Sequence, residues 1–136
     1  MACLDTTFLI DLSRRHGSRR ERARERLRDL QKAGQSVCTT RFNVAELQVG
    51  VFRCHDPERE REAIRAVLAG LEVLEFRAPA ATIFARIAAH AQKIGRPVGD
   101  MDALIAATAL AENERLLITR NPSHYADLPG IIAETY

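Results

Sequence analysis

The sequence has no long apolar run and no paired-cysteine motif, and both absences narrow the class of protein. Its apolar stretches fall far short of the ~20 residues that a membrane-spanning helix needs. The residues after Met1 show neither the basic nor the apolar segment of a signal peptide. The three cysteines are odd in number and none belongs to a CxxC pair, which disfavours a disulfide framework and a structural zinc site. We therefore expect a cytoplasmic protein with free thiols and no membrane segment.

Motifs for nucleophilic catalysis and nucleotide binding are also missing. There is no GxSxG pattern for a catalytic serine, and no cysteine stands beside a base. The phosphate-binding patterns GxxxxGK[ST] and GxGxxG are absent as well. Any catalytic chemistry must therefore come from other groups.

The size and the order of the apolar segments predict a single α/β domain. The chain has 136 residues, 46% of them apolar and 28% charged, which is typical of one globular domain. Strand-like segments alternate with helical ones throughout, which predicts a domain over residues 1–136 with a mainly parallel central sheet flanked by helices. The expected strands are 2–4, 36–39, 72–76, 115–119 and an edge strand at 131–135. The expected helices begin at Thr6 or Thr7, at Thr40 and after Gly99, and span 18–33, 56–71 and 79–94.

The stretch 97–112 carries two acidic residues at the start of its helix, Asp100 and Asp102. Positions two apart on a helix point in different directions, so the two side chains do not share a face. Asp102 lies on the same face of the predicted helix as alanine and isoleucine residues. Its side chain is therefore expected to point toward the core, where a carboxylate needs a partner or a cation. Asp100 follows Gly99, and its simplest role is the N-cap of the helix.

Three further polar residues are expected near Asp102. Asp5 and Asn121 follow predicted strands, and Glu46 lies among apolar or small neighbours on the helix that follows another strand. The carboxyl ends of parallel strands meet at one edge of the sheet, where ligands bind, so these residues are expected to converge. Crowded carboxylates repel one another and suit Mg²⁺ or Mn²⁺. Such ions activate water for phosphodiester cleavage.

Residues 14–32 concentrate basic charge. They hold nine arginines and lysines against three acids, although the net charge of the chain is only +2. Arg20, Arg24 and Arg28 are like charges at four-residue spacing, which is unfavourable unless an anion arrives. The segment can bind nucleic acid or an acidic partner, and the alternative is a solvated helix with local ion pairs.

Four segments of the chain form a pattern when taken together. They are LDTTFLIDL at 4–12, TTRFNVAELQVGV at 39–51, PVGDMDALIAATAL at 97–110 and LLITRNPSHYADLPGI at 116–131. In this order and spacing they resemble PIN-domain proteins, specifically VapC-type toxins of bacterial toxin–antitoxin pairs. The resemblance implies a PIN fold and an endoribonuclease that hydrolyses RNA with a water activated by Mg²⁺ or Mn²⁺. It also implies a cognate VapB-like antitoxin that inserts a segment into the active-site groove.

The resemblance also assigns roles to particular residues. Asp5, Glu46 and Asp102 match the family's catalytic and metal-binding acids, with Glu46 binding the ion directly or through water. Asn121 stands where many relatives carry an aspartate; it can position a water or a phosphate but adds no negative charge, so a second ion is left open. Asp100 lies near enough to bind such an ion or a water.

Supporting and RNA-binding residues are expected as well. Thr6 and Thr119 are expected to orient the metal ligands, with helix capping as the alternative role of Thr6. Basic residues are expected to guide the RNA backbone, and cleavage in this family leaves a 5′-phosphate and a 3′-hydroxyl. The expected RNA contacts are Arg14, Arg15, Arg20, Arg24 and Arg120, with His124 as a further candidate.

Two other functions stay open at this point. One is a PIN fold that binds RNA or protein without catalysis. The other is a receiver-like Mg²⁺-binding signalling domain. That domain would need a lysine after a late strand, where Arg120 stands, and both lysines of this chain lie in predicted helices.

The sequence also suggests self-association. Phe42, Val49 and Phe52 recur along one predicted helix and would form an apolar patch if they are exposed. We therefore expect a homodimer, or a hetero-oligomer with the antitoxin. The alternative is that these side chains complete the core.

Overall fold

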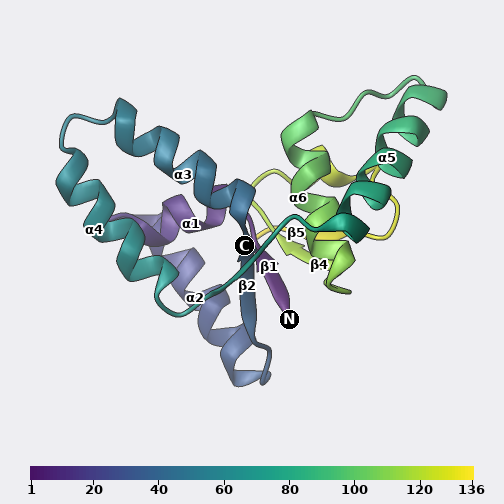
Figure 1. The fold of residues 1–136 in the computed structure, drawn as a ribbon. Helices are drawn as coiled ribbons and strands as arrows, with labels where there is room; N and C mark the ends of the chain where they lie inside the picture. Colours follow the sequence, from purple (N-terminus) through teal and green to yellow (C-terminus); the bar gives the residue numbers. More distant parts are fainter.

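The computed structural model describes all 136 residues, which form a central sheet between two layers of helices (Figure 1). The strands are β1 (Ala2–Leu4), β2 (Val37–Thr40), β3 (Glu72–Leu74), β4 (Leu116–Ile118) and β5 (Ile132–Glu134). The helices are α1 (Thr6–Ser13), α2 (Ser18–Lys32), α3 (Arg41–Arg53), α4 (Pro57–Leu68), α5 (Ala78–Lys93) and α6 (Asp100–Ala111), with a short 3₁₀ helix η1 (Pro122–Tyr125). All neighbouring strands are parallel, in the order β3-β2-β1-β4-β5. Helices α1 to α4 cover one side of the sheet, and α5 and α6 cover the other.

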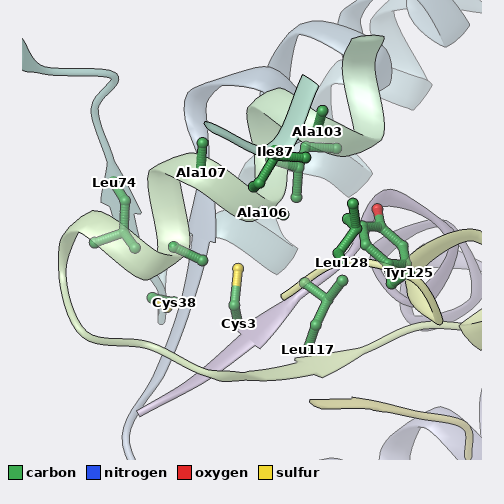
Figure 2. Packing of buried hydrophobic residues seen from close by; sticks show 12 residues of the cluster. Cys3, Cys38, Leu74, Ile87, Ala103, Ala106, Ala107, Leu117, Tyr125 and Leu128 are labelled. Carbon is green, nitrogen blue, oxygen red and sulfur yellow. The ribbon is translucent and has the colours of Figure 1, made fainter. Parts of the chain in front are cut away.

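The alternation of side chains along the central strands builds two cores. In β1, Ala2 and Leu4 pack against α1 to α4, whereas Cys3 packs on the side of α5 and α6. Leu117 of β4 lies in the same core as Cys3, beneath the alanines of α6 (Figure 2). The alanines of α6 are small, so this helix packs directly on the strand residues of the same core.

The predicted α/β fold with a parallel sheet is confirmed. All five expected strands form, and their bounds lie within three residues of those expected. The helices start and end within the same margin because their signals are local: glycine ends α2 and α5, and Asp56 caps α4 ahead of a proline. None of the helices is both long enough and apolar enough to cross a bilayer.

Helix α3 leaves two apolar side chains in solvent. Val49 is 53% exposed and Phe52 is 79% exposed. Phe42 is half-buried instead and packs edge-on against Phe76, with ring centroids 5.5 Å apart. Of the three positions expected to form a patch, Val49 and Phe52 are available on the surface and Phe42 helps to complete a core.

Candidate active site

Polar side chains gather at the carboxyl ends of β1, β2 and β4. Asp5 follows β1, Thr40 ends β2, and Thr119 follows β4. Strands β2 and β3 lie on one side of β1, and β4 and β5 lie on the other, so the strand order reverses beside β1. In open parallel sheets ligands bind at such a switch point. The topology therefore favours a binding site next to Asp5.

Asp5 is only 6% exposed, and its carboxylate accepts four hydrogen bonds. The hydroxyls of Thr119 and Thr7 donate to Oδ2 at 2.8 and 2.9 Å. The amide of Asn43 and the hydroxyl of Tyr125 donate to Oδ1 at 3.2 and 3.3 Å. These donors come from four separate parts of the chain, so the tertiary fold holds the carboxylate in one orientation. All four donors are neutral and leave its negative charge unpaired.

Asn43 joins this carboxylate to the start of α3. Its Oδ1 accepts from the Thr40 N–H at 3.1 Å and its own N–H donates to the Thr40 hydroxyl oxygen at 3.3 Å, which together form a capping box. The Thr40 hydroxyl also donates to Asn43 Oδ1 at 2.7 Å. Asn43 Nδ2 donates both to Asp5 and, at 3.0 Å, to the hydroxyl oxygen of Thr6. The Thr6 hydroxyl in turn donates to Glu46 Oε2. One buried side chain thereby links the cap of α3 to two acids of the site.

Glu46 lies one turn further along α3 and is half-buried. Burial raises the pKa of its carboxyl above the usual range. The hydrogen bond from Thr6 opposes this rise, and the negative charges of Asp5 and Asp102 add to it. The three predicted acids therefore lie close enough to repel one another.

Asp102 lies in a polar groove of about 290 Å³ between the segment 96–99 and η1. Burial raises the pKa of its carboxyl, and the charge of Asp5 adds to the rise. His124, whose Nδ1 lies 3.5 Å from Asp102 Oδ2, and a hydrogen bond from Tyr125 act in the opposite direction. The Tyr125 hydroxyl donates to Asp5 and lies near Asp102, and its own pKa is raised by burial and by these two charges.

The prediction that Asp100 caps α6 is wrong. Gly99 occupies the N-cap position, with its carbonyl accepting from the Ala103 N–H at 3.0 Å, and Asp100 is the first helical residue. Asp100 is exposed and lines a separate groove toward α5, whereas Asp102 lines the groove beside His124. The two acids face different sides of the helix, as their spacing predicts.

The remaining polar residues predicted for the site lie at the same edge. Thr119 supports Asp5 directly, and the Asn121 N–H donates to its hydroxyl at 3.1 Å. Asn121 is half-buried, and its side chain makes no cap hydrogen bond to η1. Thr6 contacts Glu46 and does not cap α1, whose N-cap position is held by Asp5.

Sequence reasoning missed Asn43, Thr7 and Tyr125 as part of the site. Thr7 lies only two residues from Asp5, whereas Asn43 reaches Asp5 only in the folded chain. Tyr125 lies 120 positions from Asp5 in a polar loop that gave no signal. The capping box was the one local clue to Asn43.

The basic helix α2 leads into the start of β2, so its C-terminal end lies at the opposite edge of the sheet from the carboxylates (Figure 1). Arg20 and Arg24 line a largely apolar groove against α4. Arg14 and Arg120 both point their guanidinium groups at Asp11 on α1. The structure therefore does not bring these arginines into contact with the predicted acids.

The donor set at the candidate site consists of oxygen atoms. Carboxylates of this kind, surrounded by hydroxyls, suit the hard cations Mg²⁺ and Mn²⁺. No three acidic, histidine or cysteine side chains are gathered closely enough to enclose an ion by themselves. An ion held by these acids would therefore have to keep several of its own waters, as Mg²⁺ commonly does.

Comparison with known proteins shows clear relatives in sequence. The profile of the PIN domain family matches residues 2–128. Ribonuclease VapC2 from Haemophilus influenzae is 30% identical over 106 residues, which cover 78% of this chain and 79% of that protein. The tRNA(fMet)-specific endonuclease VapC from Shigella flexneri is 29% identical over 100 residues, which cover 74% and 75% of the two chains.

Solved structures match over almost the full length. The structure of VapBC2 from Rickettsia felis bound to a promoter DNA fragment contains a chain that matches with a TM-score of 0.88 and 25% identity. A chain in the DNA-bound VapBC structure from Salmonella typhimurium matches with a TM-score of 0.84 and 27% identity. Each match covers 99% of this chain and 98% of the other.

Proposed function

This chain belongs to the PIN-domain family, and on this premise we propose that it is an endoribonuclease toxin of the VapC type, dependent on Mg²⁺ or Mn²⁺. The observation that carries the proposal is the set of acids at the carboxyl edge of the sheet. Asp5, Glu46 and Asp102 meet there, and burial together with their repulsion raises the pKa of two of them. Relatives named as a ribonuclease and as a tRNA(fMet)-specific endonuclease support RNA as the substrate.

The same three acids are the residues that would hold the ion. Their mutual repulsion is the kind of strain that a divalent cation relieves. When bound, Mg²⁺ or Mn²⁺ supplies positive charge that stabilises the cleaved phosphodiester and makes water a better nucleophile. A second ion, with Asp100 beside it, is disfavoured because that side chain lines a different groove.

The surrounding side chains fix and tune these acids. Asp5 cannot rotate without breaking four hydrogen bonds, so its oxygens are presented in one arrangement. Thr6 engages one oxygen of Glu46, and the raised pKa makes this carboxyl a stronger base than an exposed glutamate. Glu46 is therefore suited to accept the proton from the attacking water. The amide of Asn121 is suited to bind a phosphate oxygen.

Partners are proposed from the relatives. The solved relatives are VapBC pairs, which supports a cognate VapB-like antitoxin that silences this chain. A homodimer is also proposed, since Val49 and Phe52 expose apolar surface on α3. An RNA substrate and an antitoxin imply activity in the cytoplasm. Sedimentation of the purified chain at micromolar concentration would test the dimer.

Purified protein, free of antitoxin, should cleave RNA only when a divalent ion is present. Total cellular RNA incubated with the protein and Mg²⁺ or Mn²⁺ should yield discrete fragments, and EDTA should abolish them because the acids then lack the charge that activates water. Sequencing of the fragment ends would identify the target. The ends should carry a 5′-phosphate and a 3′-hydroxyl.

A folded protein that binds Mg²⁺ but cuts no RNA would favour a non-catalytic PIN module. Cleavage that continues in excess EDTA would contradict the assigned role of the acids. Circular dichroism of the same sample shows whether the protein was folded. These outcomes separate the proposed enzyme from a binding module of the same fold.

RNA affinity should fall with rising salt if α2 binds the RNA backbone. Each phosphate neutralised on a single strand contributes about 0.7 to the slope of log affinity against log salt. Replacing Arg20 and Arg24 together by glutamine should therefore reduce that slope by about 1.4. Fluorescence anisotropy with labelled RNA in EDTA measures affinity without cleavage. The matched control is Arg65→Gln on α4, where the arginine is exposed and pairs with Glu62 at 3.5 Å.

A slope unchanged by the double replacement would show that α2 does not contact RNA. The question is open because α2 ends at the opposite edge of the sheet from the acids, so RNA bound at the acids need not reach it. An equal loss of slope in Arg65→Gln would mean that RNA binding is spread over the whole surface. Only a loss confined to α2 supports the predicted RNA contacts.

A further inference from the structure

Asp11 on α1 is a buried carboxylate that the proposed chemistry does not use. Its side chain is fully buried, yet it lies outside the set of acids around Asp5. An ionised carboxylate in such a position is costly unless it is paired and hydrogen-bonded. Its presence therefore requires partners, and the structure provides three of them.

One of the three partners is local, and the other two come from distant parts of the chain. Arg14 Nε donates to Asp11 Oδ1 at 3.0 Å, and Arg120 Nη1 lies 3.4 Å from the same oxygen. The Tyr136 hydroxyl donates to Oδ2 at 2.8 Å. Its ring packs edge-on against Phe8, with centroids 4.7 Å apart. Asp11 thus ties together α1, the segment after β4 and the residue that follows β5.

Arg120 connects this buried group to the candidate site. It directly follows Thr119, whose hydroxyl donates to Asp5 Oδ2. The Arg120 backbone N–H donates to the Thr7 hydroxyl at 3.0 Å, and that hydroxyl donates to the same oxygen of Asp5. The Arg120 side chain then reaches back to Asp11. The segment 119–121 is held at its backbone by Thr7 and at its side chain by Asp11.

We propose that Asp11 is a positioning residue for the nuclease site: through Arg120 and Tyr136 it holds segment 119–121 so that Thr7 and Thr119 both donate to Asp5. This inference rests on the proposed function, because it takes Asp5 as a residue of the reaction. It also assigns Arg120 a structural task in place of the RNA contact expected from the sequence. Asp11 acts through other residues and touches no reacting group.

The test compares Asp11→Asn with the wild-type protein by amide hydrogen exchange and by RNA cleavage. The variant keeps the shape of the side chain but removes the charge that holds Arg120. The amides of Arg120 and Asn121, which donate to the hydroxyls of Thr7 and Thr119, should exchange about tenfold faster. The cleavage rate kcat should fall about tenfold, with KM nearly unchanged, because Asp5 loses its fixed orientation while the RNA surface is intact.

Two further variants test whether the effects of Asp11→Asn come from the loss of its contacts. Tyr136→Phe removes the hydroxyl that contacts Asp11 and, at 3.2 Å, the Thr7 carbonyl oxygen, and it keeps the ring packing on Phe8. It should show the same local effects at smaller size if Asp11→Asn folds poorly. Glu134→Gln is the matched control, since Glu134 joins the same C-terminal segment to Arg26 at the surface without contacting Asp11. It should change neither the two amides nor kcat.

Several results would overturn the proposal. Faster exchange throughout the sheet would mean that Asp11 only stabilises the fold. Unchanged exchange at Arg120 and Asn121 would mean that Asp11 does not hold this segment. Faster exchange at these two amides with an unchanged kcat would mean that holding the segment does not position Asp5. If the wild-type protein cuts no RNA, the proposed function fails, and exchange at the two amides still decides whether Asp11 holds the segment.

Discussion

Replacing Asp102 with asparagine should slow RNA cleavage roughly a thousandfold, because an ion contributes several kcal/mol of charge stabilisation and each 1.36 kcal/mol is tenfold in rate. The same change should make the metal-free protein more stable at pH 7. Asp102 is partly buried and lies near the charge of Asp5, so its own negative charge destabilises the folded state. The same charge is needed in the proposed reaction to hold the ion. Loss of activity with a gain in melting temperature would be the signature of an acid retained for function.

The pH dependence of that stability gain follows from the direction of the pKa shift. Burial, followed by the charge of Asp5, raises the pKa of Asp102 in the folded state despite the opposing effects of His124 and Tyr125. The folded state then binds the proton more tightly than the unfolded state does. Stability is lost as the pH rises from the ordinary aspartate pKa, about 4, through the raised value. The difference between the variant and the wild type should therefore be largest at neutral pH and vanish below about pH 4.

Thermal melting in EDTA at pH 7 and at pH 3.5, with cleavage assays in Mg²⁺, would measure both effects. Glu112→Gln is the control, because Glu112 is exposed at the other end of α6 and should change neither quantity. Asp100→Asn tests the assignment within the helix. If it abolished cleavage while Asp102→Asn did not, the wrong carboxylate would have been assigned.

The fold of this chain is predictable from its sequence because the signals for each element are local. Apolar periodicity, glycine after helices and Asp56 before a proline mark the elements within a few residues of their bounds. The acids of the site could also be identified from local features of the sequence. Asp5 follows a strand, and Asp102 and Glu46 fall on helix faces shared with apolar residues, where a charge calls for an explanation.

The contacts that hold these acids are long-range, and the sequence does not reveal them. The sequence indicates the start of α3 at Thr40, but it does not reveal that Asn43 completes the capping box or that its amide group reaches Asp5, because α3 starts beside β1 only in the fold. From the sequence, Arg120 is expected to contact RNA, but in the fold its guanidinium group lies beside Asp11. The Asp100 error arose because cap preference favours aspartate, while Gly99 takes the cap position without any side-chain bond. Residue preference alone does not identify which of the two adjacent residues, Gly99 or Asp100, occupies the N-cap.

Replacing Asn43 with alanine should be among the most destabilising single changes in this protein. Asn43 is fully buried, and its removal leaves the Thr40 N–H without its side-chain acceptor and Asp5 Oδ1 with one donor in place of two. An unsatisfied buried group costs about 1–3 kcal/mol, so the free energy of unfolding should fall by roughly 3 kcal/mol. For a domain of this size the melting temperature should drop by about 10 °C. Cleavage should also fall, because Asp5 and Thr6 lose their common donor.

Asn43→Asp separates the two tasks of this side chain. It keeps an oxygen to accept from Thr40 but turns a carboxylate toward Asp5 in place of a donor. If the cap alone explained the loss, Asn43→Asp would restore stability at pH 7. We expect no restoration, because two neighbouring buried carboxylates repel each other. Gln48→Ala, on the exposed face of α3, should leave the melting temperature within a degree or two of wild type and so exclude a general effect of substitutions in this helix.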